Sequence, residues 1–308
     1  MQQPPTDTAW ALIYNPAAGS YRPDRLEAVV RALEGEGLRV ERLPTAAPMH
    51  AAELAQAARG VHTIAVLGGD GTLNEAAQGM MRRTDDVPLA FLPGGTANVM
   101  AIAQGLPMQP ERAAILLARG RVAPVFPGIV AGRYFLLMAG VGFDAFVIHR
   151  LNLKLKRALG RHAYTLSGFK SMFAKLPAIT LMTEGQSPLR CTWAVLSLGR
   201  YYGGRNMLHA NGGLEAGTLT TMALHPAHTP RLLLRSLWYR LRDWWRPARQ
   251  GAWPAPVGAW VTGPGAEVRV ETKEPVYIQI DGDLLGAERD LTVGLSEKPL
   301  MLRFPARD

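Results

Sequence analysis

Leu67–Asn74, with the sequence LGGDGTLN, is the stretch that decides the predicted fold. An apolar run at 64–66 precedes it, and a helix-compatible stretch at 75–81 follows it. Three glycines within four positions allow the backbone to adopt positive φ and to approach a ligand closely. Amides that open a helix at this point would direct their donors at an anion. The pattern therefore predicts a phosphate-binding turn between a strand and a helix.

An ordinary strand-to-helix turn is the alternative interpretation, because a Gly-Gly pair is common in such turns. The spacing matches neither a Walker A loop, which ends in Lys-Ser/Thr, nor a dinucleotide fingerprint with its third spaced glycine. Asp70 argues for the functional interpretation, since nothing structural calls for a carboxylate between two glycines. Beside phosphates this carboxylate would hold Mg²⁺ or accept a proton.

Two further loops contain glycine in patterns that accompany this turn. They read NPAAG at Asn15–Gly19 and PGGTAN at Pro93–Asn98. Together with GGDGTLN at Gly68–Asn74, they resemble the diacylglycerol kinase catalytic family, which includes bacterial lipid kinases, sphingosine kinases and ceramide kinase. The three motifs follow that family's order and spacing, and later segments extend the resemblance over nearly the whole chain. The resemblance implies an ATP-dependent kinase that phosphorylates the hydroxyl of diacylglycerol, a sphingoid or a related lipid.

The resemblance also implies which residues contact the nucleotide. They lie in the three loops and directly after the second predicted strand: Asn15, Pro16, Ala17, Ala18, Gly19, Thr45, Gly68, Gly69, Asp70, Gly71, Thr72, Leu73, Asn74, Gly94, Gly95 and Thr96. Judged alone, the first loop carries no Lys or Arg and predicts only a loop, with Arg22 as the nearest phosphate-facing charge. Thr45 equally suits a helix cap before Pro48. Asn98 suits capping or bracing of the third loop.

Strands alternate with helices over the first third of the chain. Strands are predicted at 10–14, 38–43, 62–67 and 87–92, with helices at 23–33 and 48–58. This alternation indicates an α/β fold with a parallel sheet covered on both faces, and ligands then bind beyond the carboxyl ends of the strands. All three glycine loops lie at that edge. The resemblance implies that this nucleotide-binding domain is phosphofructokinase- and NAD kinase-like.

From residue 121 the pattern changes to strands separated by turn residues. A hairpin is predicted from 121–130 and 134–141, and further strands at 189–198, 218–224, 259–262, 267–271 and 276–280. The predicted class is an antiparallel β domain, which the resemblance implies is a β-sandwich. The resemblance further implies a nucleotide-binding domain of 1–122 with a returning tail at about 292–308, a lipid-substrate domain of 123–291, and an active site in the cleft between them.

A second candidate carboxylate ends the predicted strand Val276–Asp283, VYIQIDGD. A hairpin turn rich in Asp and Gly is the ordinary explanation of this string. In the resembling family the segment is an Asp-Gly-Glu motif whose last carboxylate accepts the proton of the acceptor hydroxyl. Asp283 stands where Glu is usual. Its side chain is shorter by one C–C bond of about 1.5 Å, and a misplacement of about 1 Å costs roughly a hundredfold in rate. By resemblance, Asp70 and Asp283 are both candidates for the catalytic acid-base residue.

Two further acidic residues are candidates for the substrate side. The segment AGVGFDA at 139–145 resembles the family's segment at the start of the lipid-binding domain, which makes Asp144 a candidate to face the acceptor headgroup, although capping of the next helix explains it equally well. Asp281 opens the Asp-Gly-Asp turn. Asp70 is the candidate ligand of a Mg²⁺ bound with ATP. A structural Mg²⁺ of the family is not expected here, because Ala216 stands where the family usually has Asp.

The net charge of +9 comes from two segments. Residues 149–175 contain seven Lys or Arg and no acid, and residues 228–250 contain six Arg and one Asp. The second segment predicts an amphipathic helix with Trp244 and Trp245 on its apolar face and arginines along its flank. Docking on an anionic membrane is the functional interpretation, and packing on the β domain with snorkelling arginines is the alternative. Nucleic acid is not an expected partner, since neither segment carries a recognised motif.

The cysteine content, the N-terminal residues and the length of the apolar runs predict the cellular compartment of the protein. The single cysteine, Cys191, excludes an internal disulfide and predicts a reducing compartment. The polar, Pro-rich residues 1–8 predict no signal peptide, and no run of about 20 apolar residues predicts a spanning helix. These features indicate a cytoplasmic protein that associates peripherally with a membrane, and a homodimer is left open. The rival interpretations are a catalytically weak or inactive lipid-binding homologue and a NAD kinase-like enzyme with a soluble substrate.

Overall fold

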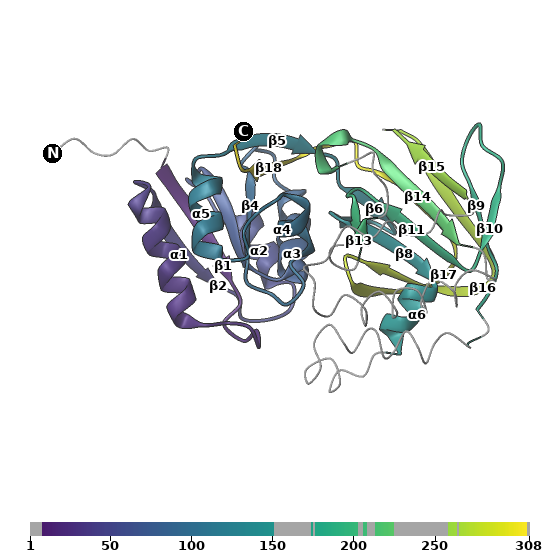
Figure 1. Cartoon of the computed structure of the whole chain (residues 1–308), viewed down its shortest axis with the longest axis horizontal. Helices are drawn as coiled ribbons and strands as arrows, with labels where there is room; N and C mark the ends of the chain where they lie inside the picture. Colours follow the sequence, from purple (N-terminus) through teal and green to yellow (C-terminus); the bar gives the residue numbers. More distant parts are fainter. Residues whose placement is uncertain are drawn as a thin grey trace, which may run out of the picture. The chain divides into compact units, whose positions relative to one another are not determined.

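The computed structural model describes residues 8–150, 174, 176–202, 206–207, 213–224, 258–263 and 265–306. The chain divides into two compact units, shown in Figure 1. Unit 1 contains Met1–Phe126 and Lys298–Asp308, and unit 2 contains Pro127–Glu297. Segment 228–250 and nearly all of 149–175 lie outside the described residues. Within the part of the chain that is described, no helix has the length and apolarity needed to cross a membrane.

Unit 1 is built on a six-stranded sheet with the order β2-β1-β3-β4-β18-β5. Its neighbouring strands are parallel, except for the antiparallel pair of β18 and β5. The strands in chain order are β1 (Ala9–Tyr14), β2 (Arg39–Pro44), β3 (Thr63–Gly68), β4 (Leu89–Pro93), β5 (Arg121–Val125) and β18 (Leu300–Phe304). Every residue of β3 and β4 is buried, as in the centre of a sheet covered on both faces.

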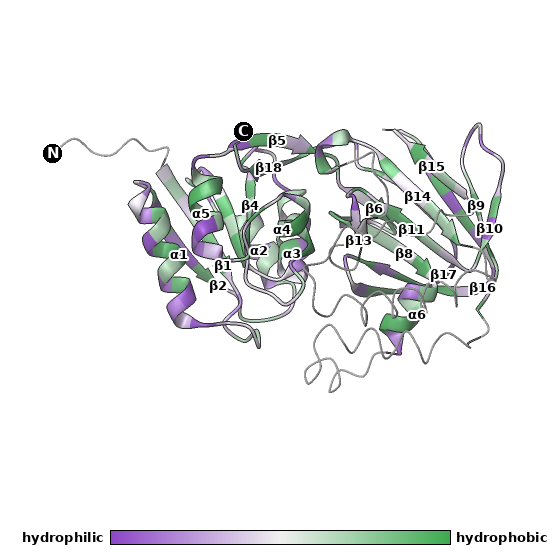
Figure 2. Ribbon diagram, viewed as in Figure 1, coloured by the Kyte–Doolittle hydropathy of each residue, from purple (hydrophilic) through white to green (hydrophobic). Residues whose placement is uncertain are grey.

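Helices lie on both faces of this sheet. They are α1 (Pro23–Gly35), α2 (His50–Ala57), α3 (Asp70–Met80), α4 (Val99–Ala103) and α5 (Pro110–Ala118). Because β2 and β3 lie on opposite sides of β1, right-handed crossovers place α1 and α2 on opposite faces. α1 packs with α5, and α2 packs with α3. Figure 2 shows the mixture of polar and apolar residues along α1, whose buried residues are those of the predicted apolar stripe: Leu26, Val29, Val30 and Leu33. The predicted α/β fold with a parallel sheet is confirmed.

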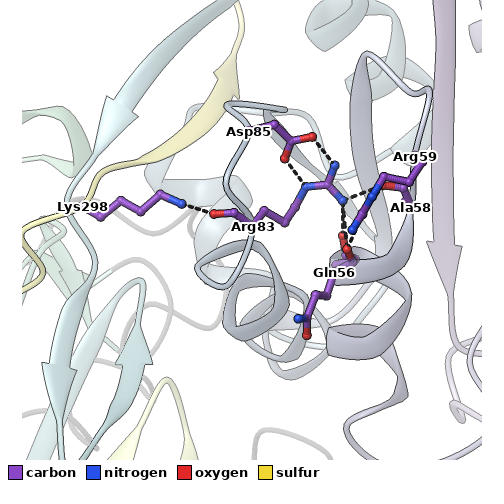
Figure 3. Close-up of polar contacts among 7 residues, drawn as sticks. Gln56, Ala58, Arg59, Arg83, Asp85 and Lys298 are labelled. Atoms are coloured by element: carbon purple, nitrogen blue, oxygen red, sulfur yellow. Dashed lines mark hydrogen bonds and ion pairs between the residues drawn. The ribbon is translucent and has the colours of Figure 1, made fainter.

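Polar contacts tie the C-terminal tail into unit 1. Lys298 Nζ donates to the backbone oxygen of Arg83, as Figure 3 shows.

The side chain of Arg83 itself contacts the end of α2. Its buried guanidinium donates to the carbonyls of Ala55 and Ala58 at 2.8 and 2.6 Å, and it pairs with Asp85 at 2.7 Å. Arg83 therefore satisfies carbonyls that the end of α2 leaves without helical partners.

Two local predictions need correction. The hairpin predicted from 121–130 and 134–141 is present around its turn, where β6 (Gly128–Val130) pairs with β7 (Arg133–Phe135). The rest of the run 121–130 is not part of this hairpin, because β5 ends at Val125 and pairs with β18. Pro127 interrupts this run, since proline has no amide proton to donate to a ladder. The helix predicted at 48–58 begins at His50 with Met49 in the cap position, so Thr45 is not its cap.

Unit 2 is an antiparallel sheet of ten strands with helix α6 (Phe143–His149) packed against β16, and the predicted antiparallel β domain is confirmed. The sheet strands are β6 (Gly128–Val130), β7 (Arg133–Phe135), β8 (Met138–Gly142), β9 (Ile179–Met182), β10 (Leu189–Cys191), β11 (Trp193–Ser197), β14 (Leu219–Leu224), β15 (Gly258–Thr262), β16 (Glu267–Ile280) and β17 (Asp283–Leu295). A separate ribbon pairs β12 (Tyr201–Tyr202) with β13 (Asn206–Met207). Burial raises the pKa of the Cys191 thiol to about 12, which leaves this cysteine an unreactive core residue.

Strand β16 pairs with three other strands of unit 2. One edge of β16 pairs with β17, while the other pairs with β9 over Arg269–Thr272 and with β8 over Ile278–Ile280. The pairing with β17 shifts register between Glu271 and Val276, and such bulges bend a strand. The turn from β16 to β17 contains the predicted acidic residues. Asp281 and Gly282 both have positive φ there, at 49° and 96°.

Candidate functional site

The carboxyl ends of β1 to β4 bring the predicted nucleotide-binding residues to one edge of unit 1. The register aligns Tyr14 with Leu67 and Gly68 with Pro93, so the loops that follow these strands begin side by side. The Thr45 amide donates to the backbone oxygen of Tyr14 at 2.8 Å, which joins the loop after β2 to the end of β1. In open α/β sheets, ligands bind at this edge.

The loop after β3 packs backbone to backbone against the loop after β4. The Gly94 amide donates to the Gly68 oxygen at 2.8 Å, and a Cβ on Gly95 would lie 2.5 Å from the Cα of Gly69. That distance is far inside carbon–carbon contact, so side chains are excluded here. The freedom of glycine to adopt positive φ is not used in this turn, because none of Gly68, Gly69 and Gly71 has a positive φ. Gly69 is extended, with φ −91° and ψ 177°, as the residue before a helix usually is.

Asp70 joins the same two loops through its carboxylate. It is the first residue of α3, and its Oδ2 and Oδ1 accept the amides of Val99 and Met100, each at 3.0 Å. These amides open α4, and the start of a helix stabilises negative charge. The Asp70 carboxylate therefore has a structural role, contrary to the expectation from sequence that none exists at this position. Burial raises the pKa of Asp70, and the hydrogen bonds from the Met100 and Val99 amides oppose that rise.

Asn98 braces the loop after β4, which is one of the two roles predicted for it; the other was capping. Its Oδ1 accepts the Gly95 amide at 2.9 Å, and its Nδ2 donates to the Gly95 oxygen at 3.0 Å. Asn98 precedes α4 with a φ of 49°, in the left-handed region that asparagine adopts more readily than most residues. Gly95 is half-buried and Thr96 is exposed, so this loop offers both to a ligand.

The loop after β1 is largely exposed. Asn15 Oδ1 accepts the Ala17 amide at 2.9 Å, which forms a local turn of the kind that asparagine favours. The guanidinium of Arg22, the predicted phosphate-facing charge, donates to the Tyr21 oxygen at 2.7 Å. The loop therefore has its own local hydrogen bonds, and its exposed backbone faces solvent.

The residues at the start of α3 divide into an accessible and a buried pair. Gly71 and Thr72 are half-buried in the first turn. Leu73 is 2% exposed and belongs to the core, and the buried Asn74 accepts Gln78 Nε2 on its Oδ1 at 3.1 Å. Sequence reasoning missed Gln78, although its spacing of four from Asn74 places the two side chains on one helical face.

Asp281 anchors the turn from β16 to β17, residues Asp281–Asp283, here called the acidic turn. Its Oδ1 accepts the amides of Leu137 and Met138, both at 2.9 Å, and its Oδ2 accepts the Leu136 amide at 2.8 Å. The Asp281 amide donates back to the Met138 oxygen at 2.9 Å. The predicted substrate-side carboxylate thus binds three backbone donors that precede and open β8.

Asp144 and Asp283 differ in their surroundings. Asp144 is 7% exposed; its Oδ1 accepts the Ala145 amide at 2.8 Å, and its Oδ2 accepts Gln279 Nε2 at 3.1 Å. Asp283 is exposed, and its carboxylate forms no hydrogen bond with any residue that the structure describes. Sequence reasoning missed Gln279, whose signal is a polar residue between the apolar positions Ile278 and Ile280 at the end of β16.

The diacylglycerol kinase catalytic domain family matches residues 9–129. A protein of Pseudomonas fluorescens named probable lipid kinase YegS-like is 32% identical over 235 residues, which cover 75% of this chain and 72% of that protein. The chain belongs to the diacylglycerol kinase catalytic family. A protein of the same name from Pseudomonas aeruginosa is 42% identical over 111 residues, and that match spans 36% of the length of each protein.

Solved structures agree with this family's fold. A crystal structure of a diacylglycerol kinase from Bacillus anthracis superposes with a TM-score of 0.71 at 20% identity, covering 96% of this chain and 97% of that one. A NAD kinase from Archaeoglobus fulgidus, solved in complex with ATP, superposes with a TM-score of 0.55 at 15% identity, covering 96% and 94%. At these identities the matches show the fold alone, and the predicted NAD kinase-like fold is confirmed.

A dedicated metal cluster is absent from the described part of this family member, where no three His, Cys, Asp or Glu side chains gather to hold an ion. Ala216 ends a short helix, Leu214–Ala216, at the position where an Asp ligand was expected from the family. The Asp70 oxygens accept amides but each keeps a second lone pair. The Asp70 carboxylate therefore fits a Mg²⁺ that is bound together with a nucleotide, because Mg²⁺ commonly takes one or two carboxylates together with phosphates and waters.

Proposed function

We propose that this chain is an ATP-dependent kinase that phosphorylates the hydroxyl of a lipid such as diacylglycerol or a sphingoid. Membership of the diacylglycerol kinase catalytic family supports a phosphotransferase. The observation that carries the proposal is the packed pair of glycine loops after β3 and β4, at the carboxyl edge of the unit 1 sheet. Glycine loops at this edge, beside the start of a helix, suit the phosphates of a nucleotide.

Unit 1 takes the nucleotide in this proposal. Gly69 precedes α3 and offers no side chain to cap it, so the amides of Gly71 and Thr72 in the first turn are suited to phosphate oxygens. Gly95 and the Thr96 hydroxyl add donors from the neighbouring loop. ATP is favoured as the donor because the NAD kinase with the same fold was solved in complex with ATP.

Asp70 is assigned to hold the two loops and to meet the metal that accompanies the nucleotide. Its bonds to the Val99 and Met100 amides keep the loop after β4 against the start of α3. When bound, Mg²⁺ neutralises charge on the transferred phosphoryl group. The same two bonds occupy one lone pair on each carboxylate oxygen, which makes Asp70 a weaker candidate for the proton acceptor.

Asp283 is assigned as the general base. A base needs a lone pair within reach of the acceptor proton, and the Asp283 carboxylate is exposed and unbonded among the described residues. In the proposed step the acceptor oxygen attacks the γ-phosphorus and passes its proton to Asp283. The bond from the γ-phosphorus to the bridging oxygen breaks, and ADP leaves with that electron pair.

A lipid acceptor places the reaction at a membrane surface. Segments 149–175 and 228–250 are proposed to dock there, since each basic residue near an anionic leaflet contributes about 1 kcal/mol. The tryptophans of the second segment suit the headgroup region.

The experiment that tests this function supplies γ-labelled ATP, Mg²⁺ and vesicles that contain diacylglycerol, a sphingoid base or a total lipid extract, with NAD as a soluble acceptor in parallel. We expect label in a lipid and none in NAD. Label in NAD alone would reject the lipid acceptor and favour the soluble-substrate alternative. Vesicle binding without any labelled product would reject the kinase and favour the inactive lipid-binding alternative.

A further inference from the structure

A line of hydrogen bonds leads from the start of α6 to the acidic turn of unit 2. The Ala145 amide donates to Asp144 Oδ1 at 2.8 Å, and Gln279 Nε2 donates to Asp144 Oδ2 at 3.1 Å. The Gly282 amide then donates to Gln279 Oε1 at 2.7 Å. The carboxylate of Asp144 is thereby connected to the residue that directly precedes Asp283.

The direction of this line is determined by its chemistry. The amides of Ala145 and Gly282 can only donate, so Gln279 must turn Oε1 to the turn and Nε2 to Asp144. Gln279 is 2% exposed and Asp144 is 7% exposed. In such surroundings a polar side chain that lacks its partner is costly. A Cβ on Gly140 would lie 2.0 Å from Asp144 Oδ2, so only glycine at this position of β8 leaves room for the carboxylate.

The other side of the turn is held as well. The Asp281 carboxylate accepts the amides of three consecutive residues, 136–138, and the Asp281 amide donates to the Met138 oxygen. Asp281 and Gly282 both keep positive φ, a conformation that persists where surrounding contacts enforce it. Asp283 follows these two anchored residues, yet its own carboxylate has no hydrogen bond among the described residues.

We infer that Gln279 and Asp144 are positioning residues, which hold the Gly282 amide so that the Asp283 carboxylate is presented in one place. This inference rests on the proposed function, in which Asp283 accepts the acceptor proton. Neither positioning residue touches the reacting atoms. Their importance follows from geometry, because a displacement of about 1 Å of a catalytic group costs roughly a hundredfold in rate.

A polarity exchange tests the inference. In Gln279→Glu, a carboxylate replaces the amide nitrogen that donated to Asp144, so two acceptors face each other. In Asp144→Asn, the new side-chain nitrogen at position 144 must face another donor, either the Ala145 amide or Gln279 Nε2. The double variant Asp144→Asn/Gln279→Glu restores the three bonds of this line, because the new amide donates to the new carboxylate, which still accepts the Gly282 amide, while the side-chain oxygen at position 144 accepts the Ala145 amide.

We expect each single variant to lower kcat for lipid phosphorylation by about tenfold or more, with KM for ATP changed by less than about twofold. The double variant should recover most of the loss. Gln186→Glu makes the same chemical change in an exposed turn of unit 2 and should keep wild-type kcat. In an Asp283→Asn background, Gln279→Glu should lower kcat no further, because the group that it positions is already gone.

Two results would overturn the inference. One is wild-type kcat in a folded Gln279→Glu variant. The other is a double variant that recovers its melting temperature but not its kcat, since Gln279 and Asp144 would then serve stability alone.

Amide hydrogen exchange tests the contact without any kinase activity. In Gln279→Leu the Gly282 amide loses its acceptor, so we expect faster exchange in the peptide that covers the acidic turn, and unchanged exchange would overturn the inference. If this exchange result is obtained while wild-type protein labels no lipid, the proposed function fails and the hydrogen-bonded support of the turn stands.

Discussion

The Asp70 carboxylate accepts the Met100 amide at 3.0 Å, so the first residue of α3 holds the first turn of α4. Its other oxygen accepts the Val99 amide at the same distance. Together with the bond between Gly94 and Gly68, these contacts make the two glycine loops one connected structure. Changes at Asp70 are therefore expected to affect both the stability of unit 1 and its binding of nucleotide.

Replacement of Asp70 by Asn should destabilise the protein. An asparagine side chain has one acceptor oxygen, so it can satisfy only one of the Val99 and Met100 amides and presents donors to the other. A buried donor left without a partner costs about 1–3 kcal/mol. Urea unfolding should show this loss, together with weaker ATP binding, whereas Asp86→Asn at an exposed position should match wild type. An unchanged free energy of unfolding would mean that these bonds do not stabilise the loops.

The contribution of Asp70 should also depend on pH. Burial raises the pKa of Asp70 above its ordinary value of 3.8, so folding favours the protonated form. Its contribution to stability is fully present below pH 3.8 and is lost as the pH rises through the raised pKa. The difference in unfolding free energy between wild type and Asp70→Asn should shrink over this interval. A difference that grows with pH would indicate a lowered pKa instead.

Gly95→Ala should separate the two glycine loops. The added Cβ would lie 2.5 Å from the Cα of Gly69, and neither backbone has a flexible end that can move aside. We expect a loss of about 1–3 kcal/mol in stability, as for other overpacked sites, and weaker nucleotide binding by calorimetry. Gly35→Ala, at the end of α1 with no atom within 4 Å of the new Cβ, is the matched control and should not destabilise. Wild-type ATP affinity in Gly95→Ala would show that the loop contact does not shape the site.

Asp283 should control turnover more than binding. Asp283→Asn removes the proposed proton acceptor and should lower kcat by about a hundredfold or more, with little change in KM for ATP. Asp283→Glu keeps the carboxylate and should retain activity. Asp290→Asn, at an exposed position of the same strand, serves as the control. Equal losses in kcat and ATP affinity for Asp283→Asn would indicate a structural role.

The segment 228–250 should govern membrane binding. Substitution of Trp244 and Trp245 by Ser removes aromatic rings that prefer the headgroup region, so sedimentation with anionic vesicles should weaken. The paired Trp→Phe changes keep aromatic surface and should preserve most of the binding. Unchanged sedimentation of the Ser variant would favour a helix that packs on the protein.

Local patterns in the amino-acid sequence were sufficient to predict the fold class of each domain. The alternation of apolar strands with amphipathic helices predicted the parallel sheet, because period and burial are local properties of a chain. The position of each glycine loop at a strand end also followed, since parallel strands end at one edge. Asn98 bracing Gly95 was predictable because the two residues are three positions apart.

Tertiary structure alone decided which distant residues the carboxylates of Asp70 and Asp144 bind. Asp70 meets Met100 across thirty positions, and Asp144 meets Gln279 across 135. Strand β5 belongs to unit 1 because it pairs with β18 from the far end of the chain. Partners so distant leave no periodic signal, because their encounter depends on how whole sheets and helices pack. The sequence by itself thus determined which loops and carboxylates are candidates, and only the fold decided which carboxylates support the backbone and which one is left exposed.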